Sequence, residues 1–107
     1  MKWYGFTPIM KTEFEFDTVK SAANREKHGI DFDAAQALWN GAAYVQDLPY
    51  QGEAREMRTG AIDGRLWSAV YTMRRSAVRL ISVRRARQNE VEDYERSIAE
   101  QRDDDEH

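Results

Sequence analysis

Residues 65–86, RLWSAVYTMRRSAVRLISVRRA, decide the fold because they hold two adjoining segments whose side chains repeat with a period of two. Residues 65–74 and 77–86 are rich in aromatic and β-branched side chains, which favours strands. Between them, Met73 to Ser76 predicts a tight connection. The stretch therefore predicts a β-hairpin.

Strand alternation divides the second segment between two faces of the sheet. One predicted face carries Val78, Leu80, Ser82 and Arg84, and the other carries Arg79, Ile81, Val83 and Arg85. Both rows are mainly apolar in the middle, so we expect a strand that is buried on both sides and emerges near its end. Arg84 and Arg85 would then point to opposite faces.

The same pattern adds strands on the N-terminal side of the hairpin. Residues 13–17, EFEFD, alternate polar and apolar side chains, and residues 42–47 and 54–63 have the same period. Asp63-Gly64 is a strong signal for a second hairpin turn. We therefore expect an antiparallel meander after residue 41.

Three segments have helical signals. Residues 18–28 lie between a capping Asp17 and Gly29. A second helix follows Asp31 or Asp33 and stops at Asn40-Gly41, and residues 88–101 form the third. The side chains predicted to be buried are Val19, Ala22, Ala23 and Glu26 in the first helix, Phe32, Ala35, Leu38 and Trp39 in the second, and Val91, Tyr94 and Ile98 in the third.

The predicted order is β-α-α-β-β-β-β-α, an α+β domain whose meander is covered on one side by helices. Residues 1–12 are predicted to be an N-terminal extension, residues 13–102 a single domain, and residues 103–107 an acidic tail. A chain of 107 residues is long enough for one core.

Composition excludes several classes of protein. Apolar residues make up 41% of the chain, which argues against disorder, and the absence of cysteine excludes disulfides and thiolate metal sites. Apolar runs are too short to cross a bilayer, and no signal core is present. We therefore expect a cytoplasmic protein with no membrane partner.

Positive charge is concentrated in one part of the chain. The formal net charge is -3, yet residues 65–87 contain seven arginines and no Asp or Glu. Two interpretations stay open: ion pairs with acids such as Glu90, Glu92, Asp93 and Glu95, or an anion site. The number of arginines favours RNA or DNA as the anion, with Trp67 and Tyr71 as stacking or core side chains.

His28 also has two interpretations. With Lys27 it complements the negative end of a helix dipole before the Gly29 stop. Alternatively, it exchanges protons near neutral pH, as a general acid or base does. No metal-ligand cluster or glycine-rich phosphate loop is found in the sequence, and no cofactor is predicted.

Six segments in order resemble the BrnT family of type II toxins: FEFD (14–17), KSAANREKHGIDFDAA (20–35), GEAREMRTG (52–60), DGRLWSAVYTMR (63–74), VRLISVRRA (78–86) and YE (94–95). These toxins are small ribonucleases related in fold to the RelE and ParE toxins. The resemblance implies metal-independent RNA cleavage that arrests translation and neutralisation by a cognate BrnA-like antitoxin. It implies contact with promoter DNA only through the toxin-antitoxin complex.

The resemblance also implies site residues. The catalytic set is His28, Tyr71, Arg84 and Arg85, and the substrate-binding set is Lys27, Arg55, Arg58, Arg74 and Tyr94. The arginines would neutralise charge on the reacting phosphate, and His28 and Tyr71 would transfer protons. Two alternatives on the same fold stay open: a ParE-like inhibitor of gyrase, or a catalytically weak partner for antitoxin binding and autoregulation.

Overall fold

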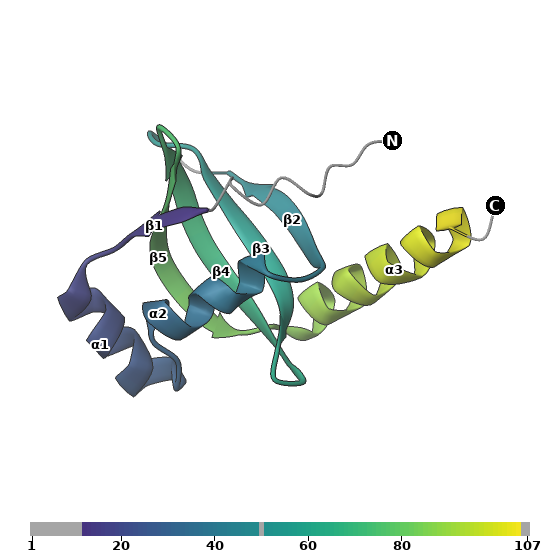
Figure 1. The fold of residues 1–107 in the computed structure, drawn as a ribbon, viewed down its shortest axis with the longest axis horizontal. Coiled ribbons are helices and arrows are strands. Elements are labelled where there is room, and N and C mark those ends of the chain that lie inside the picture. The colour runs from purple at the N-terminus through teal and green to yellow at the C-terminus, as the bar shows by residue number, and fades with distance from the viewer. Residues whose placement is uncertain (1–11, 50, 106–107) are drawn as a thin grey trace.

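Four strands form the predicted antiparallel meander. They are β2 (Ala43–Leu48), β3 (Arg55–Ile62), β4 (Arg65–Arg74) and β5 (Ala77–Arg85), each paired with the next. The short β1 (Glu13–Glu15) pairs parallel with β5, so the sheet is mixed, with the order β1-β5-β4-β3-β2 (Figure 1). This computed structural model describes residues 12–49 and 51–105, and for residues 102–105 the backbone.

The two predicted hairpin turns are present, and both use left-handed backbone. Asp63 and Gly64 have φ of 50° and 82°, as a two-residue turn with two positive φ angles requires. Arg75 has φ of 57° in the turn between β4 and β5, a conformation that costs a side chain about 1 kcal/mol. The structure confirms both connections.

The first helix, α1 (Thr18–His28), has the predicted ends. The Asp17 carboxylate accepts from the backbone N–H groups of Val19 at 2.8 Å and Lys20 at 3.1 Å. These hydrogen bonds, that of Lys20 first, lower the pKa of Asp17. Gly29 ends the helix with φ of 86°.

The prediction for the buried face of α1 was wrong. Val19 is 76% exposed, and Ala22, Ala23 and Glu26 are exposed as well. The buried side chains of this helix are polar, Ser21 and Asn24. They face the interior because backbone groups there need hydrogen-bond partners, and the Ser21 hydroxyl accepts from the Phe32 N–H at 2.9 Å.

Asn24 joins three segments of the chain. Its Nδ2 donates to the carbonyl oxygens of Ile30 at 2.8 Å and Val83 at 2.9 Å. Its Oδ1 accepts from the Val83 N–H at 3.2 Å. The amide therefore holds α1 to β5 and to the loop before the next helix, with both its N–H groups and its oxygen in use.

The second predicted helix begins as an α-helix and continues as a tighter one. Asp31 caps α2 (Phe32–Ala35), accepting from the Ala34 N–H at 2.8 Å, and the 3₁₀ helix η2 (Gln36–Trp39) follows. Phe32, Ala35 and Leu38 are buried as predicted. They form the core with β4 and β5 side chains, namely Trp67, Ala69, Tyr71, Val78, Leu80 and Val83.

The predicted faces of β5 were partly wrong, because the strand contains a bulge. Tyr71 pairs with Leu80 and Val70 pairs with Ser82, so Ile81 has no partner in the register. The extra residue reverses the alternation. Val83 and Arg85 therefore share the helix-covered face with Leu80, whereas Arg84 lies on the opposite face.

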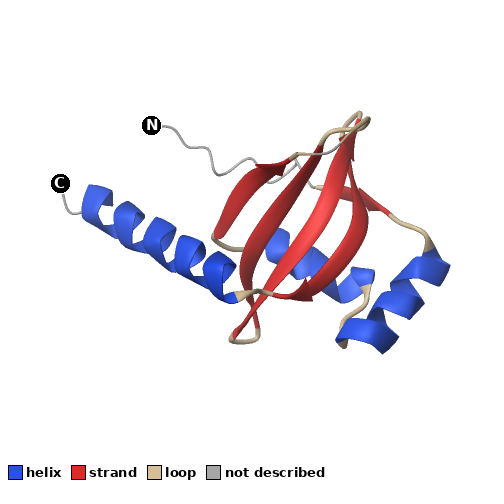
Figure 2. Ribbon diagram, turned by 180° about the vertical axis from the view of Figure 1, so that it is seen from behind, coloured by secondary structure: helices blue, strands red, loops and turns tan. Residues whose placement is uncertain are grey.

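Helices lie on both faces of the sheet, not on one as predicted. α1 and α2 cover one face, and α3 (Gln88–Asp105) starts against the other, where it packs on β2 and β3 (Figure 2). Beyond its first turns α3 projects past the sheet. Its predicted apolar stripe, Val91, Tyr94 and Ile98, is half-buried.

The division of the chain into extension, domain and tail stays a prediction. Residues 1–11 of the predicted extension lie outside the described residues. The backbone of residues 103–105, assigned to the acidic tail, continues α3.

Replacing Asn24 should destabilise the fold much more than replacing the apolar residue exposed on the same helix. Asn24→Ala should lower the free energy of unfolding by roughly 2 to 4 kcal/mol, because it leaves buried Val83 and Ile30 backbone groups unsatisfied. Val19→Ala should change it by less than about 0.5 kcal/mol. Urea unfolding of both variants measures the difference, and a larger loss for Val19→Ala would contradict the assignment of the buried face.

Candidate functional site

Three of the seven clustered arginines form ion pairs with acids from other elements. Arg74 pairs with Glu53 at 3.1 Å, Arg79 with Glu15 at 3.4 Å and Arg84 with Glu90 at 2.8 Å. Within the described part of the chain, the other four form no ion pair; they are Arg65, Arg75, Arg85 and Arg87. The ion-pair interpretation is therefore confirmed for three arginines, and the anion site stays a prediction for the other four.

Three of these four arginines lie at the same end of the sheet. Arg65 begins β4 and Arg85 ends β5, and Trp67 pairs with Arg85 across the two strands. The Ala86 N–H donates to the Leu66 carbonyl at 3.0 Å, which brings Arg87 to the same place. Arg75 lies in the turn at the opposite end.

His28 and Lys27 belong to this end as well. His28 follows Asn24 by one helical turn and shares its face of α1, and Arg85 follows Val83 on the same face of β5. α1 packs against β5 with the two elements running in the same direction, toward the lower end of Figure 1. Asn24 is bonded to Val83. His28 lies one helical turn beyond Asn24, and Arg85 lies two strand residues beyond Val83, so both follow that contact in the same direction. We call Lys27, His28, Arg65, Arg85 and Arg87 the basic end.

Arg85 is an exposed cation with a fixed support. Its guanidinium carbon lies 5.5 Å from the ring centroid of Trp67, which is 9% exposed and anchored in the core. Such a cation–π contact orients the guanidinium without using its N–H groups. Arg85 can therefore bind an anion through those groups.

A cleft of about 440 Å³ opens at the basic end, a volume in the range of ligand sites. It lies between the α1–α2 loop and the β3–β4 hairpin, and Gly29, beside His28, forms part of its wall. Arg65 and Trp67 also line it, and Asp63 is the one acid among its lining residues.

Tyr71 and Arg58, also predicted for the site, lie elsewhere. Tyr71 is 3% exposed, and its hydroxyl donates to Glu56 at 2.8 Å. Burial, and then the neighbouring Glu56 carboxylate, raises the pKa of Tyr71. Arg58 donates to the Leu38 carbonyl at 3.0 Å and lies 5.1 Å from the ring centroid of Trp39, so it holds η2 to the sheet.

The remaining predicted residues are divided between two other places. Arg55 begins β3, beside a hollow that Glu53 also lines, and Arg74 pairs with Glu53 at the surface there. Tyr94 is half-buried on α3. The structure thus places Lys27, His28 and Arg85 at the same end of the domain and the other predicted site residues elsewhere.

Arg84 takes part in a buried network on the opposite face of the sheet. Glu90, 3% exposed, accepts from both terminal nitrogens of Arg84 at 2.8 Å, from the Ser68 hydroxyl at 2.8 Å and from the Arg87 N–H at 3.0 Å. Ser68 is bonded in turn to Thr59 at 2.7 Å. Burial alone would raise the pKa of Glu90, but these hydrogen bonds, that of Arg84 first, lower it to about 2.

Two arginines of the basic end, Arg65 and Arg87, are absent from the predicted site. Both belong to the charge cluster of residues 65–87, so their place in that cluster could have identified them as candidates for the site. The start of one strand of an antiparallel hairpin also lies beside the end of the next. That rule places both arginines next to Arg85.

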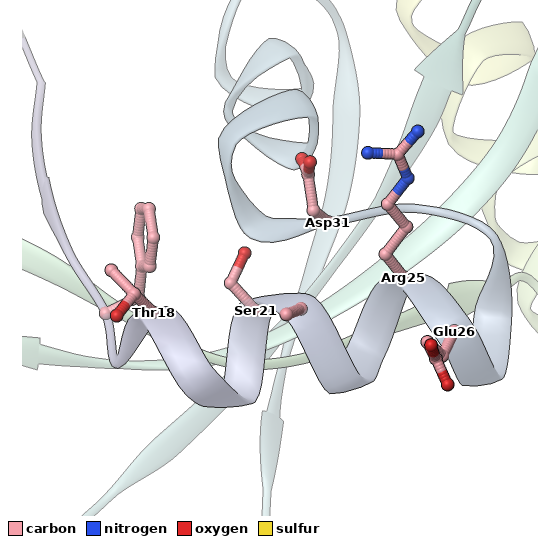
Figure 3. A pocket seen from close by; sticks show the side chains of 7 residues that line it. Thr18, Ser21, Arg25, Glu26 and Asp31 are labelled. Carbon is pink, nitrogen blue, oxygen red and sulfur yellow. The ribbon is translucent and has the colours of Figure 1, made fainter.

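A larger cleft, about 550 Å³, lies between α1 and α2 (Figure 3). All three charged residues line the cleft, and Figure 3 shows Arg25 and Asp31 extending to one side of α1 and Glu26 to the other. One arginine with two acids, Glu26 and Asp31, gives this cleft no excess of positive charge. It is a weaker candidate than the basic end for binding an anion.

Neither a metal site nor a membrane-spanning helix is found among the described residues. Within residues 12–49 and 51–101, no group of three or more His, Cys, Asp or Glu side chains is placed to hold a metal ion. None of the helices in these ranges is long and apolar enough to cross a membrane.

Unpaired arginines at the same end of a domain as a histidine are suited to binding and cleaving a phosphodiester chain. A protein-family model described as "Ribonuclease toxin, BrnT, of type II toxin-antitoxin system" matches residues 16–90, well over half of the 107 residues. The chain belongs to the BrnT toxin family. No curated protein matches the chain. The family match gives no support to gyrase inhibition.

The Glu90 network should make stability depend on pH in an acidic window. The pKa of Glu90 is about 2 in the folded chain against an ordinary value of 4.5, so the stabilisation is complete above pH 4.5 and is lost as the pH falls toward 2. The loss should be on the order of 3 kcal/mol. Urea unfolding between pH 2 and 5 measures it.

Glu90→Gln serves as the reference, because other carboxylates titrate in the same range. The variant should be less stable at pH 7, and its stability should fall less between pH 4.5 and 2 than that of the wild type. Parallel profiles for the two proteins would contradict the low pKa.

Proposed function

We propose that the chain is a metal-independent endoribonuclease that cleaves RNA and so arrests translation. The observation that carries the proposal is Arg85, an exposed cation that is supported by Trp67 and has no ion pair among the described residues, at the same end of the domain as His28. The family description, a ribonuclease toxin, supplies the reaction class. RNA brings the ligand that this site suits, a phosphate beside a 2′-hydroxyl.

The basic end offers a side chain for each step of RNA cleavage except the protonation of the leaving 5′-oxygen. His28 would take the proton of the 2′-hydroxyl, whose oxygen then attacks the neighbouring phosphorus and breaks the bond to the 5′-oxygen. Arg85, with Arg65 and Arg87, would neutralise the charge on the phosphorane oxygens. The leaving 5′-oxygen takes a proton from solvent at this open site, and the products are a 2′,3′-cyclic phosphate and a 5′-hydroxyl.

The other predicted site residues enter the proposal in different roles. Lys27 would bind a flanking phosphate, since it precedes His28 on the exposed end of α1. Tyr71, buried and bonded to Glu56, would support the core near Trp39 instead of transferring protons. Contacts with Arg55, Arg58, Arg74 or Tyr94 would require RNA that extends well beyond the basic end.

We further propose that a cognate BrnA-like antitoxin neutralises the protein in the cytoplasm. An acidic antitoxin segment would compete with RNA for the guanidinium groups of the basic end. Promoter DNA would be contacted only through the toxin-antitoxin complex. The order of two helices before an antiparallel meander favours kinship with the RelE and ParE toxins.

Arg85 should be needed for toxicity and RNA cleavage, and an equally charged residue at the far end of the sheet should not. Arg85→Gln should lower kcat/KM on single-stranded RNA by about 10²-fold, and His28→Gln by about 10²- to 10⁴-fold. Both should relieve growth arrest when expressed in bacteria. The measurements are RNA cleavage by purified protein and colony growth.

Arg75→Gln is the matched control, because it removes the same charge from the opposite turn. It should retain cleavage within about threefold of the wild type, since surface changes of this kind are small. Equal losses for Arg75→Gln and Arg85→Gln would rule out a localised site. A wild-type protein that cuts no RNA would rule out the enzyme.

A further inference from the structure

The neighbouring arginines Arg84 and Arg85 have opposite surroundings. Arg85 is exposed and rests on an aromatic ring, whereas the Arg84 side chain is 21% exposed and bound to both oxygens of Glu90. We propose that Arg84 and Glu90 are positioning residues that set the geometry of Arg85 and Arg87 from the opposite face of the sheet, without touching RNA. This inference rests on the proposed function.

The network is bonded directly to the backbone of the two site arginines. Arg84 Nη1 donates to the Arg85 carbonyl at 3.2 Å, and Glu90 accepts from the Arg87 N–H at 3.0 Å. Between them, the Ala86 N–H is bonded to Leu66 of β4. Three consecutive residues are therefore held in place where β5 ends and the chain turns into α3.

Arg84 has little capacity left for a phosphate. Its two terminal nitrogens form a bidentate pair with Glu90, and Nη2 also lies 3.7 Å from the Met57 sulfur. A phosphate would have to displace Glu90 and leave that carboxylate buried without its cation, which is strongly unfavourable. Arg85 binds an anion without such an exchange.

The other arginine pairs of the cluster lack these properties. Arg74–Glu53 and Arg79–Glu15 are single contacts between side chains that are 33% to 48% exposed, and pairs this open to solvent contribute little. Neither pair bonds the backbone of a residue at the basic end. In contrast, the single carboxylate of Glu90 accepts hydrogen bonds from Ser68, Arg84 and the Arg87 N–H.

Two readouts separate positioning from phosphate contact. The first is the salt dependence of binding to a single-stranded RNA with 2′-O-methyl groups, which cannot be cleaved. Removing one phosphate-binding cation reduces the slope of log K against log salt by about 0.7. The second is rescue of kcat on cleavable RNA in a double variant that replaces the buried ion pair by a neutral amide pair.

Arg84→Gln should lower kcat by on the order of 10²-fold, because it misplaces Arg85 and Arg87. Arg84→Gln/Glu90→Gln should return kcat to within about tenfold of the wild type, because one amide can bond the other and still accept from the Arg87 N–H. Its salt slope should equal that of the wild type. Arg85→Gln should reduce the slope by about 0.7.

The inference is overturned if Arg84→Gln/Glu90→Gln stays as inactive as Arg84→Gln and its slope also falls by about 0.7. If circular dichroism shows that either variant does not fold, Ser68→Ala replaces it in the test, because this substitution removes one hydrogen-bond donor to Glu90 and no charge. It should lower kcat several-fold at an unchanged slope, and an unchanged kcat would overturn the inference. A wild-type protein that neither binds nor cuts RNA would mark failure of the proposed function itself.

Discussion

The Asn24 side chain is the constraint on which the arrangement of this domain depends. Its amide bonds Val83 twice and Ile30 once, and so fixes α1 against β5 and sets the start of the α1–α2 loop. Since those backbone groups are buried, the inner face of α1 must be polar, and its small apolar residues are left outside. The same contact sets the alignment of the two elements. His28 and Arg85 therefore emerge at the same end of the domain.

The sheet divides neighbouring positive charges between its two faces. The bulge at Ile81 assigns Arg85 to the helix-covered face and Arg84 to the face where α3 begins. A carboxylate from α3 neutralises Arg84, whereas an aromatic ring supports Arg85 and leaves its charge available. One strand end thus supplies a structural ion pair and an exposed arginine that forms no ion pair among the described residues. This division explains how a mildly acidic chain can present exposed, unpaired positive charge at one end of its sheet.

Local signals were enough to predict the elements, but not how they contact one another. Asp17, Gly29 and the Asp63-Gly64 turn are set by backbone geometry within a few residues, so the sequence predicted them correctly. The buried face of α1 was mispredicted because the partner of Asn24 lies 59 residues away. Alternation cannot reveal a bulge. For the site, the charge cluster was visible, but the division into paired and unpaired arginines required long-range contacts.

The central claim is that RNA binds at the basic end through Arg85 and not through Arg84. NMR chemical-shift mapping with a 2′-O-methyl single-stranded RNA tests it most directly, because arginine Nε–H and tryptophan indole N–H signals report on side chains. The predicted result is large shifts for the Arg85 Nε–H and the Trp67 indole, with the Arg84 Nε–H unmoved. Shifts centred on Arg84, or on Arg58 and Trp39, would contradict the account.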